Sequence, residues 1–155
     1  MALKVVIHRH INDSVALHEV SIDASDVIGL TTAISSMDPN LVAAVACNTS
    51  VFVGAPVRMS GATAVNAIAT SYSGANFIGI CVNKPTDSTC DVRVGGITSA
   101  IYSGLTINAD QLLSDRSAGF INETQVGSGN ISLRVGTAFD SQRVIIFKGA
   151  MTRRA

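Results

Sequence analysis

From residue 41 onward the sequence is divided into short β-rich runs, and this division most constrains the fold. Runs rich in Val, Ile, Phe and Thr alternate with Gly, Ser, Asn, Asp and Pro. The runs are VFVGAPVRM, TAVNAIA, NFIGICV, TCDVRV, ISLRVGTAF and RVIIF. β-branched and aromatic residues favour strands, and turn residues every ten positions or so are typical of all-β sandwiches and barrels. We therefore predict a mainly β protein, built as a small antiparallel β-barrel or sandwich.

The run TCDVRV shows how such a strand is expected to sit in the fold. Cys90, Val92 and Val94 alternate with Asp91 and Arg93. Because successive side chains on a strand point to opposite faces, the alternation predicts one face in the core and one toward solvent or a partner. No repeat of 20 to 50 residues is visible in the chain.

The first 40 residues have a different texture. Two alternating stretches, LKVVIHR and ALHEVSI, flank the turn-like INDS and predict a strand pair. After them Asp23, Ser25 or Asp26 can cap a short helix that ends before Pro39. We therefore divide the chain into an N-terminal arm (1–40, a strand pair plus a short helix), a β-domain (41–150) and a tail (151–155).

Composition bounds the partners of this chain. Its 155 residues suit a single β-domain with its arm; charged residues are 14%, against roughly 25% in ordinary soluble proteins, and the formal net charge is zero. So neutral a surface gives little protection against association, and we expect partners to cover part of it. There is no Lys/Arg cluster beyond Arg153 and Arg154, and no apolar run approaches the 18 or so residues of a membrane helix. We expect neither a nucleic-acid partner nor a membrane span.

The start of the chain and its cysteines indicate the compartment. MALKVVIHRH lacks the apolar core and cleavage site of a signal peptide, so we expect folding in a cytosol. Cys47, Cys81 and Cys90 are odd in number and have no CxxC spacing. This favours reduced, buried thiols over a disulfide framework or a zinc cluster.

Histidines give little support for a metal site. His8 and His10 are two apart on an expected strand and would share a face, but no third ligand is evident. His18 and Glu19 are neighbours on a strand and would point to opposite faces, so they do not form an acid/base pair. We expect no metal and no cofactor.

The stretch YSGLTINADQLLSDRSAGFI (102–121) holds the candidates for catalysis. None of the GxGxxG, GxxxxGK[ST], GxSxG and HExxH motifs occurs in the chain. An enzyme would therefore have to use Asp110 and Asp115, as a carboxylate pair that cleaves a glycosidic bond. The chain has no Trp and few aromatics to stack on a sugar.

The alternative is that the polar residues of this stretch shape turns. Short polar side chains hydrogen-bond nearby backbone and tolerate tight conformations, which suits Asn108, Asp110, Ser114 and Asp115. We favour this interpretation and expect no catalytic residue. It predicts a strand and turn at 100–105, a bend at 108–110, a short strand at 111–114 and a new strand beginning at Phe120 and Ile121.

A longer pattern covers roughly residues 41 to 148. It comprises an F-x-G-I-x-V strand, x-V-x-V-x-G, an aromatic followed by S-G-L-T, a bend, L-S, a G-x-I hairpin and V-G-x-A with a closing apolar strand. The matching residues are Phe77, Gly79, Ile80, Val82, Val92, Val94, Gly95, Tyr102, Gly104, Leu105, Thr106, Leu113, Ser114, Gly119, Ile121, Val135, Gly136, Ala138, Val144, Ile145 and Ile146. This pattern resembles a small β-domain of tailed-bacteriophage virion proteins, to whose opening strand VFVGAPVRMSG is also similar. The chain departs from it at Asn108–Asp110, where the family usually has a glycine.

The resemblance implies a non-enzymatic virion protein that folds in the host cytoplasm. In phages such domains resemble parts of head decoration (cement) proteins and of tail-fibre proteins, commonly as trimers. A short chain without a repetitive shaft suits a decoration protein that binds the major capsid protein, with the arm reaching a neighbouring subunit. A tail or tail-fibre component bound to other tail proteins is the alternative.

Overall fold

A computed structural model describes residues 3–11, 14–22 and 38–155 of the chain, the first two ranges as backbone strands. The chain divides into two compact units, Met1–Pro39 and Asn40–Ala155, each of which is described by itself. The helix expected after Asp23 falls on residues outside the described ones. No helix long and apolar enough to cross a membrane occurs in the described ranges.

The first unit contains a β-hairpin. Strands β1 (Leu3–Ile11) and β2 (Ser14–Ile22) pair antiparallel in an unbroken register. The predicted strand pair is therefore present.

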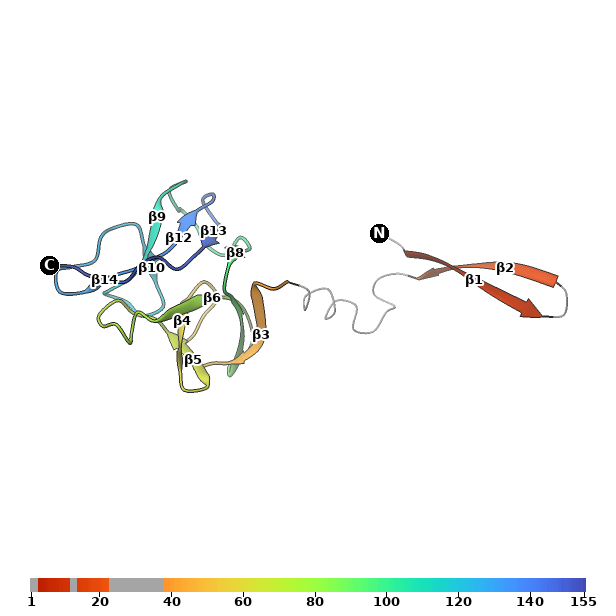
Figure 1. The fold of residues 1–155 in the computed structure, drawn as a ribbon, viewed down its shortest axis with the longest axis horizontal. Coiled ribbons are helices and arrows are strands. Elements are labelled where there is room, and N and C mark those ends of the chain that lie inside the picture. The colour runs from red at the N-terminus through yellow and green to blue at the C-terminus, as the bar shows by residue number, and fades with distance from the viewer. Residues whose placement is uncertain (1–2, 12–13, 23–37) are drawn as a thin grey trace. The chain divides into compact units, whose positions relative to one another are not determined.

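The second unit holds two five-stranded antiparallel sheets and a small accessory sheet (Figure 1). The first sheet has the order β3-β7-β6-β4-β5, from β3 (Leu41–Ala46), β4 (Pro56–Ser60), β5 (Thr63–Asn66), β6 (Phe77–Thr86) and β7 (Thr89–Arg93). The second has the order β8-β13-β12-β9-β10, from β8 (Gly96–Ile97), β9 (Asp110–Leu113), β10 (Ile121–Asn122), β12 (Arg134–Ala138) and β13 (Val144–Ile146). The accessory sheet pairs β11 (Ile131–Ser132) with β14 (Thr152–Arg153).

The two large sheets have the same topology. In each, the first strand along the chain pairs with the last, the last with the fourth, the fourth with the second and the second with the third. In this count the strands of the second sheet are β8, β9, β10, β12 and β13, because β11 lies in the accessory sheet. The domain is thus built from two halves of one plan, although no repeat is visible in the sequence.

The register repeats as well as the order. Val57 pairs with Gly79 and Arg58 with Phe77, so that one residue of β6 bulges out. In the second half Gln111 pairs with Gly136 and Leu112 with Arg134, and one residue of β12 bulges at the same place. Arg134 therefore occupies the position of Phe77, and Gln111 that of Val57.

A glycine follows each bulge because the neighbouring strand leaves no room for a side chain. A Cβ atom on Gly79 would lie closer than 3.0 Å to the carbonyl oxygen of Arg93. A Cβ atom on Gly136 would lie equally close to the carbonyl oxygen of Ile145. These contacts with backbone explain two of the glycines in the recurring pattern.

The bend before the second strand of each half also repeats. Gly54 donates its N–H to Cys81 O at 2.7 Å with a φ of 95°. Asn108 donates to Ala138 O at 2.9 Å with a φ of 65°. Asn tolerates this left-handed conformation better than most residues, so Asn108 supplies the bend that a glycine supplies in the first half.

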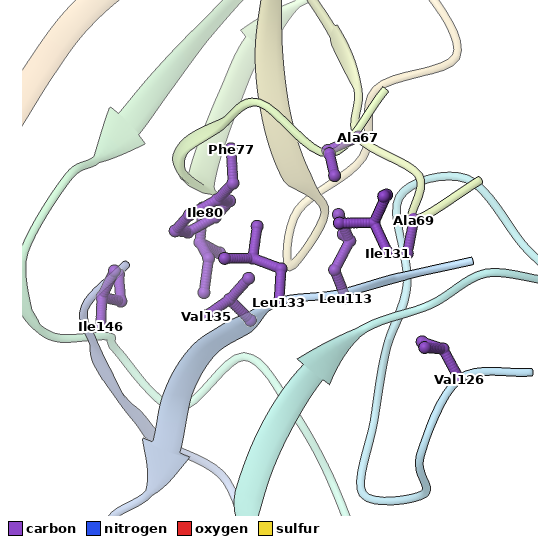
Figure 2. Packing of buried hydrophobic residues seen from close by; sticks show 11 residues of the cluster. Ala67, Ala69, Phe77, Ile80, Leu113, Val126, Ile131, Leu133, Val135 and Ile146 are labelled. Atoms are coloured by element: carbon purple, nitrogen blue, oxygen red, sulfur yellow. The ribbon is translucent and has the colours of Figure 1, made fainter. Parts of the chain in front are cut away.

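One hydrophobic cluster joins the two halves (Figure 2). Phe77 and Ile80 of the first sheet lie opposite Leu113, Leu133 and Val135 of the second half. A second cluster belongs to the first half alone and contains the three cysteines with Val51, Ala55, Val57, Ala64 and Val92. The shared cluster makes the second unit a single body.

Several predictions are confirmed at the level of fold. The protein is mainly β with antiparallel sheets, and the runs containing β4, β6, β7, β12 and β13 form strands as expected. Cys90 and Val92 are buried, whereas Val94 lies beyond β7 and is 39% exposed. The placement of Val94 in the core was therefore wrong.

Other expectations are corrected. None of the described sheets closes into a barrel; a single parallel bridge joins Cys47 to Ala64 in the first half. Residues 100–105 form no strand, because Ile101 and Tyr102 both donate their N–H groups to Gln142 O instead of entering a ladder. The expected tail 151–155 contains β14, which pairs with β11.

Candidate functional site: an aromatic-rimmed groove

A groove of about 390 Å³ lies where the two halves of the second unit meet. Residues 52–54 of the first half form one wall, and the second half contributes most of 101–105 together with 119–121. Phe52 and Phe120 are both exposed, and their ring centroids lie 5.0 Å apart at an interplanar angle of 48°. Two aromatic rings thus face solvent as a contacting pair.

Backbone hydrogen bonds fix the walls of the groove. Ala55 donates to Phe52 O at 3.0 Å, which closes the turn that carries Phe52. Gly119 donates to Ala67 O at 2.8 Å, and Ser114 donates to Phe120 O at 3.0 Å. The groove is therefore largely preformed, as binding sites usually are.

Tyr102 connects the two walls. Its hydroxyl donates to the carbonyl oxygen of Gly54 at 2.9 Å. A Cβ atom on Gly54 would lie 3.4 Å from the Tyr102 ring, so the ring packs directly on this turn. Burial raises the pKa of Tyr102, and its phenol is therefore a structural donor in its neutral form.

The chemistry of the groove favours contact with apolar groups. Its lining residues include no Asp, Glu, His, Lys, Arg or Cys. Exposed aromatic pairs bind through buried apolar area and ring contacts, and contiguous exposed apolar patches mark interaction sites. The lining also includes the polar Ser103, so the groove is suited to a protein surface that presents both apolar and polar groups.

Asp110, the first of the two candidate carboxylates, is bound to a neighbouring strand. Its Oδ1 lies 2.6 Å from Nη2 of Arg134 on β12. The same guanidinium donates to Thr137 Oγ1 at 2.6 Å and lies 4.7 Å from the centroid of the Phe147 ring. Asp110 begins β9 and is thus a strand residue, whereas the sequence indicated a turn.

Asp115, the second, links two loops beyond the other end of β9. Its Oδ2 accepts hydrogen bonds from the N–H of Gly127 at 2.7 Å and from Nδ2 of Asn130 at 2.9 Å. The Gly127 bond, helped by Asn130, lowers the pKa of Asp115. Each carboxylate therefore has its own partners. Those of Asp115 lie 12 and 15 positions further along the chain, so its carboxylate joins distant loops, whereas the sequence predicted hydrogen bonds to nearby backbone.

The predicted thiols and histidines divide between the two units. Cys47, Cys81 and Cys90 are free and buried, and burial raises the pKa of Cys81 and of Cys90. Buried, apolar surroundings of this kind keep a thiol unreactive. His8 and His10 lie on β1, where only the backbone is described. Within the ranges whose side chains the structure describes, no group of three potential metal ligands occurs.

Sequence reasoning missed the groove. Phe52 and Phe120 are 68 positions apart along the chain, and neither lies in a sequence motif that indicates binding. The available signal was local: each aromatic lies beside a turn that contains a glycine with positive φ, Gly54 and Gly119. Only the packing of the two halves brings these turns together.

Comparison with protein-family models, with curated proteins and with solved structures gave no match for this chain.

Proposed function

We propose that this protein is a non-enzymatic structural protein of a tailed-phage virion, a capsid decoration (cement) protein that binds the head shell as an oligomer. The observation that carries the proposal is the preformed groove with its exposed Phe52–Phe120 pair on a chain without net charge. The resemblance of residues 41 to 148 to phage β-domains supports the class of protein. A compact, mainly β domain of antiparallel sheets suits a unit that lies on a lattice.

The mechanism would be binding alone. Apolar area removed from water stabilises an interface by about 25 cal/mol per Å², before the costs of association. Contact between the groove and the major capsid protein would add this free energy to the shell. The proposed oligomer is a trimer, which would make several such contacts at once and so increase the overall affinity.

Sedimentation with heads assembled without this protein tests the proposal. The full-length protein should sediment with the heads, and Phe120→Glu should weaken binding at least tenfold, because it places a charge in the apolar contact. The matched control is Ile107→Glu, since Ile107 is also apolar and exposed (61% against 52% for Phe120) but does not line the groove.

Three outcomes are informative. Loss of binding with Phe120→Glu alone supports the groove as the contact. Equal binding by both variants would remove the groove from the proposal. Failure of the full-length protein to bind heads, together with antibody labelling of the tail, would replace the decoration role with the tail or tail-fibre alternative.

A further inference from the structure

The two halves of the second unit pack on each other through different faces. The first half contributes Phe77 and Ile80, which belong to the shared cluster (Figure 2) and not to the cysteine cluster. The second half contributes Leu113, Val135 and Ile146. This is a head-to-tail contact, in which unlike surfaces of like units meet.

Because the register repeats, each surface has a counterpart in the other half. In the second half, Arg134 occupies the position of Phe77 and Thr137 that of Ile80. Ile80 is fully buried, whereas Thr137 is half-buried. Its cross-strand neighbour Ile145 is 38% exposed, and Ile97, which pairs with Ile145, is 41% exposed. The face that is covered in the first half is thus open in the second.

The converse holds for the first half. By the same register Met59, Ile78 and Val94 occupy the positions of Leu113, Val135 and Ile146. Leu113 and Val135 are fully buried in the shared core, whereas Met59 and Val94 are exposed and Ile78 is half-buried against the cysteine cluster. The first half therefore carries a partly uncovered version of the surface that the second half uses to cover its neighbour.

We propose that a second copy of this chain covers the open face of the second sheet, and that it does so with the Met59–Ile78–Val94 surface of its own first half. The contact between two copies then has the same arrangement as the contact between the two halves of one chain. This likeness is the reason why we choose a second copy as the partner. This contact specifies which surfaces meet in the proposed homo-oligomer, and the inference rests on that proposal. Head-to-tail contacts close into rings when the rotation allows, so three of them would form the proposed trimer.

The composition of the open face fits a contact between copies. Apolar area comes from Ile97, Ile145 and Phe147, all of them exposed. The Arg134 guanidinium is held against Phe147 and ion-paired to Asp110, so the charge on this face has a partner in its own chain. A second copy would meet a surface that is mostly apolar with its charge already paired, which lowers the cost of burying it.

Chemical cross-linking of the full-length protein tests this contact. Ile80 and Val135 belong to the shared cluster (Figure 2), and the corresponding pair between copies is Thr137 of one and Ile78 of the next. Thr137→Cys and Ile78→Cys are made singly in the full chain, whose native thiols are buried. A short bis-maleimide is added to each variant alone and to an equal mixture, and a mixture of Ile107→Cys with Ile78→Cys is the matched control.

The expected result is a cross-linked dimer in the mixture of Thr137→Cys and Ile78→Cys, and at least tenfold less in either variant alone or in the control. Dimers in a single variant alone would indicate a two-fold contact between like surfaces and overturn the proposal. If light scattering shows an oligomer but the mixture gives no dimer, this contact is wrong and the proposed oligomer stands. If the full-length protein is a monomer at all concentrations, both this contact and the proposed oligomer are wrong.

Discussion

At the scale of single residues, backbone conformation explains positions that side-chain chemistry does not. Ala44 has a φ of 54°, in the left-handed region, and lies where the register between β3 and β7 shifts. Its N–H leaves the strand ladder and donates to Asp91 Oδ1 at 2.9 Å. An alanine in this conformation is strained by roughly 1–2 kcal/mol.

Replacing Ala44 by glycine should therefore stabilise the protein. The strain relieved exceeds the roughly 0.4–1 kcal/mol that glycine adds to the freedom of the unfolded chain. We expect a net gain of about 0.5–1 kcal/mol in the free energy of unfolding, measured by urea denaturation. Ala43→Gly is the matched control: it is an exposed neighbour with ordinary φ, and it should lose about 0.5–1 kcal/mol. Equal losses in both variants would mean that Ala44 is not strained.

Residue identity also explains why the two halves of like topology show no repeat in the sequence. Buried Val57 corresponds to buried Gln111, whose Nε2 donates to Glu123 Oε1 at 3.0 Å. Phe77 corresponds to Arg134, an apolar residue to a charged one. Equivalent positions share backbone geometry but not chemistry, so comparison of residue types finds no repeat.

At the scale of elements, the alternation of apolar and polar residues predicted most of the long strands. β6, β7 and β12 were recognisable because they have one buried face and cross the middle of a sheet. Of the two-residue strands, β10 begins at Ile121 as predicted and β11 lies within the predicted run ISLRVGTAF. Strands β8 and β14 were not predicted, because they have too few residues for a pattern and are positioned by pairing with distant segments.

Strand β14 gives a test at this scale. Met151 packs against the shared core, Thr152 and Arg153 pair with β11, and the Arg154 guanidinium donates to Val126 O. Removing residues 151–155 should destabilise the protein by about 2 kcal/mol and lower its Tm by about 4–8 °C. Removal of Ala155 alone is the control and should leave the Tm unchanged. If the truncated protein kept the Tm of the full-length protein, residues 151–155 would be a tail that does not stabilise the fold.

At the scale of the whole molecule, the shared core couples the two halves. The three thiols lie in the cluster of the first half, whereas Tyr102 belongs to the second. Neither half can lose its fold without exposing the cluster that joins them, so cooperative unfolding is expected.

The thiols and the tyrosine should therefore report the same transition. In the native protein we expect no reaction of Cys47, Cys81 and Cys90 with a thiol reagent. In a Tyr72→Phe variant, whose one remaining tyrosine is Tyr102, full thiol reaction and tyrosine fluorescence should have the same urea midpoint. Labelling that is complete at a lower urea concentration would show that the first half opens alone. Native labelling of one thiol would contradict its burial.

The edges of the sheets have a consequence for solubility. Unpaired strand edges invite association with other chains, and many proteins protect them with charge. Here the net charge is zero. Edge strands β8 and β10 are two residues long, β3 is interrupted by the left-handed Ala44, and the four-residue β5 carries a bridge from Ala64 to Cys47. Resistance to aggregation in this chain then depends on backbone shape, so a change in salt concentration should affect it much less than an insertion that lengthens an edge strand.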